Sequence, residues 1–321
     1  MRIEVVGTNV LGYTAQSLIG PLIPDSIDVE RFERSSIAFT YQDPAGARLR
    51  MELRGEFSGT SPETAVGTVS EVVLSVQAVG GYQTYQTWSE IGRSLQDFVV
   101  SNLGSLLAGD DTFLGGALAD TAHGATGRDV FVGRGGDDTF FGGEGTDTAT
   151  FTGLRDAYVV TRSADRLVVA DTAPTRDGTD TLLSVERLQF SDGILAFDTA
   201  GTAGAGYRLY QAAFARAPDA EGLGFWVRAL DQGMALRDAA AAFITSAEFQ
   251  QKYGTSVSDA AFVDALYQNV LGRSPDEGGA AYWQGELARG LARADALVSF
   301  SESPENVALV APSTADGIWL L

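Results

Sequence analysis

Residues 106–150 read LLAGDDTFL GGALADTAH GATGRDVFV GRGGDDTFF GGEGTDTAT, which divides into five consecutive units of nine residues. The sixth position of every unit is an aspartate: Asp111, Asp120, Asp129, Asp138 and Asp147. The eighth position is always apolar: Phe113, Ala122, Phe131, Phe140 and Ala149. A register kept over five units without an insertion indicates a structural repeat rather than a flexible glycine-rich linker.

The residue type at each position predicts a turn followed by a short strand. Glycine at the first and fourth positions permits the backbone conformation of a tight turn. The segment Asp-x-apolar-x that follows is a short strand whose eighth residue faces a core. One unit cannot bury enough surface alone, so the units are expected to stack into a parallel β-roll. Two units complete one coil, which places units one, three and five on one edge and units two and four on the other.

Stacking brings the acidic side chains of neighbouring coils together. Strands in a sheet lie ~4.8 Å apart, and two carboxylates ~5 Å apart repel by ~3 kcal/mol at an effective dielectric of ~20. Calcium removes this repulsion, because it accepts carboxylate and carbonyl oxygens together. The spacing predicts three calcium sites: Asp111 with Asp129, Asp129 with Asp147, and Asp120 with Asp138. The site with Asp120 departs most from the pattern, because Leu118 replaces a turn glycine.

The candidate metal ligands are the five aspartates together with neighbouring turn residues, which offer carbonyl or further carboxylate oxygens. The full set is Asp111, Asp120, Asp129, Asp138, Asp147, Gly109, Gly124, Thr126, Gly127, Gly133, Gly135, Gly136, Gly142, Glu144 and Gly145.

Units one, four and five closely resemble the pattern Gly-Gly-x-Gly-x-Asp-x-apolar-x of the hemolysin-type calcium-binding RTX repeat, and units two and three resemble it loosely. The resemblance implies a secreted protein that binds Ca²⁺ in the roll. Residues 311–321, in which a stretch of small residues precedes Asp316 and the apolar residues 318–321, are similar to the uncleaved C-terminal signal of type I-secreted RTX proteins. A short apolar end that docks on the preceding domain is the alternative.

Composition narrows the class of protein further. The chain has 321 residues, a net charge of −20 and no cysteine. Its length allows two or three domains. The negative charge makes nucleic acid an unsuitable partner, and the lack of cysteine excludes disulfides and cysteine-ligated zinc. No stretch approaches ~18 consecutive apolar residues, so no membrane-spanning helix is expected, and residues 1–10 lack the pattern of a cleaved signal peptide.

Residues 1–88 are predicted to form an antiparallel β domain, because residues 37–41, 48–54 and 69–79 show alternation or β-branched enrichment. Residues 80–88 interleave aromatic with amide and hydroxyl side chains, which suits either a final strand or a sugar-binding surface. Residues 89–105 are predicted to form an amphipathic helix with Ser89 as its N-cap and Ile91 on its apolar face. Such a helix would cap the open end of the roll.

Residues 151–199 are predicted to return to strands, near 157–161, 166–170 and 177–193, and to close the roll. This arrangement resembles the β segment that follows RTX rolls in bacterial secreted proteins. Its carboxylates Asp177, Asp180 and Asp192 adjoin glycines, so they either hold a further calcium or form turns. Residues 200–206 are rich in glycine and alanine and are predicted to be a linker.

Residues 207–310 contain a second internal repeat, with matching residues 57 positions apart. Each copy is predicted to run helix, Arg-x-Pro-Asp-x-x-Gly loop, helix with Trp, glycine stop, helix. The aspartates of the loops suit helix N-caps. The arginines suit pairing with a nearby carboxylate or with a helix C-terminus. The tryptophans lie on apolar faces, which favours a core over a sugar-binding platform. The matching pairs include Tyr210 and Tyr267, Arg216 and Arg273, Asp219 and Asp276, Trp226 and Trp283, Phe243 and Phe300, and Glu248 and Glu305.

This tandem region resembles a bacterial helical domain of unknown function that accompanies RTX repeats and is related in style to the anchoring region of S-layer proteins. The resemblance implies attachment to lipopolysaccharide or another surface polysaccharide near the two Arg-x-Pro-Asp loops, with self-assembly as a further possibility.

The sequence offers no nucleophile motif and no zinc-binding His-Glu-x-x-His helix, and its one histidine, His123, lies in the degenerate second unit at a position expected to be an exposed strand residue. We therefore expect no enzyme in the assigned segments. The predicted class is a multidomain α+β protein: secreted, calcium-dependent and associated with the cell surface in the manner of an S-layer protein or adhesin. Two alternatives stay open, a secreted enzyme and a soluble carbohydrate-binding protein, each using the roll only for export and folding.

Overall fold

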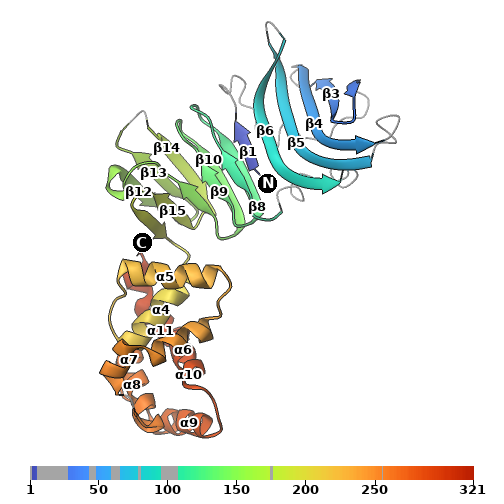
Figure 1. Cartoon of the computed structure of the whole chain (residues 1–321). Coiled ribbons are helices and arrows are strands. Elements are labelled where there is room, and N and C mark those ends of the chain that lie inside the picture. Colours follow the sequence, from blue (N-terminus) through green and yellow to red (C-terminus); the bar gives the residue numbers. More distant parts are fainter. Residues whose placement is uncertain are drawn as a thin grey trace. The chain divides into compact units, whose positions relative to one another are not determined.

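The computed structural model describes residues 2–5, 28–42, 48–58, 66–78, 81–94, 108–173, 176–254 and 256–321. The chain divides into two compact units, residues 1–191 and residues 192–321. The first unit contains an antiparallel sheet and a β-roll, and the second contains the helices (Figure 1). The predicted α+β class is confirmed.

The N-terminal sheet is built from long antiparallel strands. Along β4 the side chains of Leu49, Met51, Leu53 and Phe57 are buried, as expected where one face of a strand covers a core. The strands are β1 (Arg2–Val5), β2 (Asp28–Phe32), β3 (Ser36–Gln42), β4 (Arg48–Ser58), β5 (Val66–Ala78) and β6 (Gly81–Ser94), in the spatial order β1-β6-β5-β4-β3-β2.

The helix predicted to begin at Ser89 is wrong at its start. Ser89 and Ile91 belong to β6, in which Ser89 pairs with Arg2 of β1 and with Glu71 of β5. Hydrogen bonding to a strand on each side outweighs the local N-cap preference of a serine. The other residues of that predicted helix, 95–105, lie outside the described residues.

Strand β1 joins the N-terminal sheet to the roll. It pairs antiparallel with β6 and parallel with β7, where Ile3 lies opposite Phe113. A strand is therefore hydrogen-bonded to the first coil, where the sequence predicted a capping helix, and the N-terminal sheet continues into the sheet of the roll.

The roll consists of two parallel sheets whose strands come alternately from odd and even units (Figure 1). Phe113 lies opposite Phe131 in one sheet, and Ala122 lies opposite Phe140 in the other. The rings of Phe131 and Phe140 stack between the sheets with centroids 5.0 Å apart. The odd sheet contains β7 (Thr112–Leu114), β9 (Val130–Val132), β11 (Thr148–Thr150) and β15 (Arg187–Phe190), and the even sheet contains β8 (Thr121–Gly127), β10 (Thr139–Gly145) and β14 (Thr179–Leu183).

His123 lies in β8 and stacks on Phe141 of β10 with ring centroids 4.4 Å apart. It is half-buried, so the expectation of an exposed position is wrong, and burial lowers the pKa of its imidazole. The stacked ring of the next coil replaces solvent on one of its faces.

An inserted hairpin interrupts the roll between β11 and β14. It comprises the short helix η3 (Arg155–Ala157) and the antiparallel strands β12 (Tyr158–Arg162) and β13 (Leu167–Asp171). β13 pairs with β14, and β14 then resumes the parallel ladder beside β10. The strands predicted near 157–161 and 166–170 are confirmed.

The second unit contains two paired strands and eight helices within the described residues. The four helices α4 to α7 are repeated as α8 to α11 at the predicted spacing. In the described part of the chain, no helix has both the length and the apolar character needed to cross a membrane. The elements are β16 (Gly193–Ala196), α4 (Thr202–Phe214), α5 (Ala220–Asp231), α6 (Leu236–Thr245), α7 (Ala247–Tyr253), α8 (Asp259–Leu271), α9 (Glu277–Ala288), α10 (Arg293–Ser301), α11 (Pro304–Thr314) and β17 (Ile318–Leu320).

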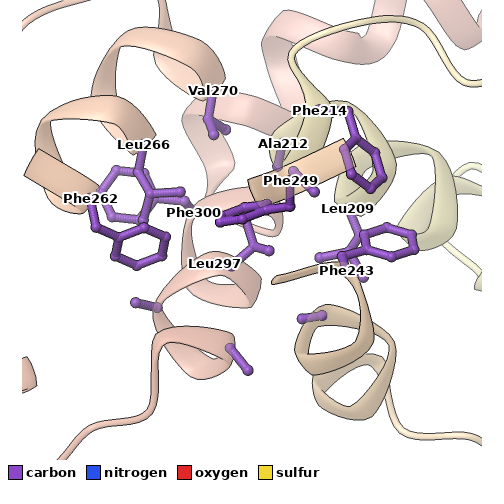
Figure 2. Packing of buried hydrophobic residues seen from close by; sticks show 14 of the residues in the cluster. Leu209, Ala212, Phe214, Phe243, Phe249, Phe262, Leu266, Val270, Leu297 and Phe300 are labelled. Carbon is purple, nitrogen blue, oxygen red and sulfur yellow. The ribbon is translucent and has the colours of Figure 1, made fainter. Parts of the chain in front are cut away.

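Aromatic side chains from both copies of the repeat fill the helical core (Figure 2). Trp226 packs edge-on against Phe243 with centroids 4.7 Å apart. Its counterpart Trp283 packs against Phe300 at 5.1 Å. Both tryptophans are half-buried against the core, which confirms their predicted role in packing.

The two Arg-x-Pro-Asp loops have the same local structure. Asp219 accepts a hydrogen bond from the Gly222 N–H, and Asp276 accepts one from the Gly279 N–H, so both are N-caps as predicted. Arg216 binds the Glu248 carboxylate, and Arg273 binds the Glu305 carboxylate, with an N–O distance of 2.7 Å in each copy. The predicted arginine–carboxylate pairs are thus confirmed.

The predicted linker at 200–206 is wrong from Thr202 onward, where α4 begins. The glycines of this segment serve close packing: a Cβ on Gly204 would lie 1.8 Å from the Thr199 carbonyl oxygen.

The C-terminal residues form a strand of the second unit. β17 pairs antiparallel with β16, and Ile318 and Leu320 are buried in a small core of the second unit.

Candidate metal-binding ladder

The repeat aspartates form two ladders, one along each edge of the roll. In each ladder the Oδ1 atom of an aspartate accepts a hydrogen bond from the main-chain N–H of the aspartate one coil earlier. Asp129 accepts from Asp111 at 2.9 Å, and Asp147 accepts from Asp129 at 2.8 Å. On the other edge Asp138 accepts from Asp120 at 2.8 Å. The structure therefore brings together the three pairs that the spacing indicated.

The second carboxylate oxygen, Oδ2, is available to bind a cation in most of the repeat aspartates. Within the described residues, Oδ2 of Asp129, Asp138 and Asp147 is buried and accepts no hydrogen bond. A buried carboxylate oxygen without a donor is unfavourable, because it has lost its water and gained no partner. A bound cation would satisfy these atoms.

Each free oxygen faces the first glycine of its own unit. A Cβ built on Gly124 would lie 2.0 Å from Asp129 Oδ2 and 2.6 Å from the carbonyl oxygen of Gly142 in the next coil. A Cβ on Gly142 would lie 2.4 Å from Asp147 Oδ2 and 1.9 Å from the Ser184 carbonyl oxygen. Glycine at these positions leaves room beside a carboxylate and a carbonyl, the two oxygen types that calcium prefers.

The turn residues named from the sequence occupy the same edges. Gly145 has φ +139°, and a Cβ there would lie 1.7 Å from the Gly127 carbonyl oxygen, so only glycine allows this approach of the coils. Gly109, Gly127 and Gly136 also have positive φ. Thr126 and Glu144 are exposed and lie opposite each other across β8 and β10, whereas the repeat aspartates are buried.

Unit two differs from the others. Oδ2 of Asp120 accepts a hydrogen bond from the Gly116 N–H at 2.6 Å. The turn itself therefore satisfies the oxygen that stays free in units three to five. Leu118, which replaces the turn glycine, is 46% exposed.

Two ladder residues lie beyond the five contiguous units: Asp180, which the sequence left open between a calcium ligand and a turn residue, and Glu186, which the reasoning from sequence did not name. Asp180 Oδ1 accepts from the Asp138 N–H at 2.9 Å, and Glu186 Oε2 accepts from the Asp147 N–H at 2.9 Å. Asp180 had a usable signal, because Gly178, Asp180 and Leu182 match positions four, six and eight of a further unit.

Asp177, named beside Asp180 from the sequence, has a different role. Its carboxylate accepts hydrogen bonds from the N–H and hydroxyl of Thr152 and from the hydroxyl of Tyr158. It is therefore a structural acceptor that holds the start of the inserted hairpin.

Burial disfavours the charged form of the ladder carboxylates in the absence of metal. It raises the pKa of Asp129 to about 7, and neighbouring aspartates add to the shift. It raises the pKa of Asp138 to about 8 and that of Asp180 to about 7. The pKa values of Asp120 and Asp147 are raised for the same reason.

The donor set fits calcium shared between turns. Among the described residues, no three acidic, histidine or cysteine side chains converge on one point. One or two carboxylates per position leave the remaining ligands to carbonyl oxygens, and Ca²⁺ takes six to eight oxygen ligands in flexible geometry. When bound, the ion would supply the positive charge that the buried carboxylates lack.

Without metal, stability is expected to fall as pH rises. The folded-state pKa values of about 7 and 8 lie above the ordinary 3.8, so the folded chain binds more protons than the unfolded chain in between. The metal-free roll is thus most stable below about pH 4 with respect to these groups, and this contribution is lost as pH rises through about 8. Thermal unfolding in chelator should show a falling midpoint between about pH 5 and pH 8.

Calcium should reverse this trend, because the ion competes with protons for the same oxygens and binds better as pH rises. The stabilisation by saturating calcium is therefore expected to grow over the same pH range. A midpoint in chelator that rises with pH would contradict the assignment of these buried carboxylates.

Comparisons with known proteins agree with the geometry. Residues 114–149 match the family described as RTX calcium-binding nonapeptide repeat (4 copies). Residues 240–310 match the domain of unknown function DUF4214. No curated protein matches the chain.

One solved structure found by fold comparison is the extracellular lipase LipA from Serratia marcescens, with 22% identity and a TM-score of 0.15. The match covers 26% of this chain and 14% of the lipase, so the chain spans a small part of that protein. The chain carries calcium-binding RTX nonapeptide repeats followed by a DUF4214 domain.

Proposed function

We propose that this protein is secreted, folds on extracellular calcium and acts by binding at the cell surface or in the extracellular matrix. The observation that carries the calcium-dependent step is the set of buried carboxylate oxygens without donors at Asp129, Asp138 and Asp147. Extracellular calcium modules bind at ~10⁻⁴–10⁻³ M, so the sites stay empty at cytosolic calcium concentrations. The roll would remain loose during export and fold outside.

The parts of the chain have separate roles in this proposal. Residues 108–150 form the contiguous coils of the RTX roll, residues 151–191 close it, and residues 202–314 form the tandem helical region. The matched families are a calcium-binding repeat and a domain of unknown function, and we assign no catalytic step to the chain.

Exposed aromatic residues at equivalent positions of the helical repeat support attachment to a polysaccharide. Phe225 is 58% exposed and Tyr282, its counterpart in the second copy, is 57% exposed. Each ring lies edge-on to the neighbouring tryptophan, with centroids 5.1 Å and 5.2 Å apart. Both lie on the helix that follows an Arg-x-Pro-Asp loop, the region to which the S-layer resemblance points. An exposed aromatic ring can stack on the apolar face of a sugar.

The double variant Phe225→Ala/Tyr282→Ala is expected to lose at least tenfold in retention on lipopolysaccharide or envelope polysaccharide, with unchanged helix content. The measurement is co-sedimentation of the full chain with purified polysaccharide in calcium. Leu309→Ala is the matched control, because Leu309 is 53% exposed and not aromatic. Equal retention of both variants and the wild type would rule out these rings as the attachment surface.

Fractionation of the producing cells tests the surface location. The protein should be found in the envelope or matrix fraction in calcium and be released by a chelator. A protein that stays inside the cell in both conditions would contradict the proposal.

A further inference from the structure

We propose that a calcium ion binds between Asp138 and Asp180, across the inserted hairpin and beyond the matched repeat segment. The two residues are 42 positions apart, whereas ladder partners in the contiguous units are 18 apart. This inference rests on the proposed calcium-dependent function and adds a site to it.

Both carboxylates are buried, and a hydrogen bond from the main chain of one residue to the side chain of the other links them. Asp138 is 1% exposed, Asp180 is 2% exposed, and Asp180 Oδ1 accepts the Asp138 N–H. Oδ2 of Asp138 has no hydrogen-bond donor in the described part of the chain and faces Gly133, where a Cβ would lie 2.0 Å away. This is the arrangement seen at Asp129 beside Gly124.

The turn before Asp180 repeats the backbone of a contiguous unit. Gly178 has φ +78°, and a Cβ there would lie 1.9 Å from the Gly136 carbonyl oxygen. The contiguous pair Gly145 and Gly127 gives 1.7 Å. The two coils are therefore packed as closely as two nonapeptide units, despite the insertion.

A second contact repeats as well. Asp137 Oδ1 accepts a hydrogen bond from the Thr179 N–H at 2.8 Å. In the contiguous units Asp110 Oδ1 accepts from the Arg128 N–H at 2.9 Å. Residues 176–183 thus occupy the positions of a sixth unit, with a carboxylate where the metal ligand belongs.

Nearby charged groups are engaged elsewhere. The Arg176 guanidinium binds the Asp171 carboxylate at 2.6 Å, and Asp177 is held by Thr152 and Tyr158. The buried pair Asp138 and Asp180 is left as the acidic rung between β10 and β14.

An ion at this rung would tie the inserted hairpin to the roll. Val169 of β13 lies opposite Asp180 of β14, and β14 lies beside β10. Calcium would therefore order β13 and β14 in the same step as the contiguous coils.

The test is the number of calcium ions bound by the full chain with Asp180→Asn, measured by native mass spectrometry and isothermal titration. Asparagine keeps an Oδ1 acceptor for the Asp138 N–H but loses the charge, so a merely structural role would survive. We expect one ion fewer than in the wild type. Asp156→Asn, an exposed change of the same charge in the insertion, should bind the wild-type number. An unchanged count in Asp180→Asn would overturn the inference.

Hydrogen exchange of the unmutated chain tests the same point if Asp180→Asn does not fold. Amides of β14 and of β10 are expected to gain protection at the same calcium concentration. Protection of β10 without β14 would overturn the inference and leave the calcium-dependent function intact. A wild-type chain that binds no calcium would overturn both.

Discussion

Removal of calcium is expected to lower the free energy of unfolding of the first unit by about 4–8 kcal/mol. Each site contributes ~1.4–2.7 kcal/mol when calcium is ~10- to 100-fold above its dissociation constant, and three sites follow from the contiguous repeat. A loss of this size is comparable with the net stability of a domain. For a unit of this length it corresponds to a fall of about 10–30 °C in the melting midpoint.

Scanning calorimetry of the full chain in calcium and in chelator provides the measurement. The helical unit serves as an internal reference, because its loops are held by protein groups, such as the Arg216–Glu248 and Arg273–Glu305 ion pairs. The melting midpoint of the helical unit should be the same in calcium and in chelator, whereas that of the roll should fall in chelator. Magnesium should restore little, because it demands octahedral geometry and dehydrates reluctantly. A roll transition unmoved by chelation would contradict the assignment.

The physical cause is the burial of acidic groups without opposite charges. Asp129 is 2% exposed and Asp147 is fully buried, and each has an oxygen without a donor. In chelator these groups must either take up protons or repel one another in a medium of low dielectric. At neutral pH the metal-free roll is therefore less stable than the calcium-bound roll.

The roll could be predicted from sequence because its register repeats. Position six always carries the acid and position eight always the core residue, so the strand direction, the coil and the buried face follow together. The same holds for the helical unit, where the 57-residue spacing aligned Asp219 with Asp276 and gave both N-caps. Because the units repeat, the residue type required at each position can be read from more than one copy.

The wrong predictions each rested on a single local feature of the sequence. Ser89 has the local character of an N-cap, but its pairing with strands on both sides is a long-range property. The glycines of α4 suggested a linker, whereas Gly204 permits a close backbone contact. The role of Asp180 was left open because the inserted hairpin places it 42 positions after Asp138, whereas ladder partners in the contiguous units are 18 positions apart.

The substitution Gly124→Ala is expected to remove about 3–5 kcal/mol of stability in calcium through lost ion binding, in addition to its cost in overpacking. The added Cβ would lie 2.0 Å from Asp129 Oδ2 and 2.6 Å from the Gly142 carbonyl oxygen, so it fills the space beside the free oxygen. Asp129 belongs to two predicted sites, one with Asp111 and one with Asp147. Losing both at ~1.4–2.7 kcal/mol each gives the expected size.

Gly135→Ala is the matched control, because it adds the same methyl group within the same roll and keeps the main-chain carbonyl oxygen that makes residue 135 a candidate ligand. Its Cβ would lie 3.5 Å from the nearest atom, the Arg176 carbonyl oxygen, which is an ordinary contact. This variant should unfold within about 0.5 kcal/mol of the wild type.

Denaturant unfolding in calcium and in chelator separates the two causes of loss at Gly124. Overpacking alone costs about 1–3 kcal/mol and acts in both conditions, whereas the loss of calcium ligands acts only when calcium is present. The difference between Gly124→Ala and the wild type should therefore be larger in calcium than in chelator. If it is the same in both, the glycine serves packing alone, and the space beside Asp129 is not where the ion binds.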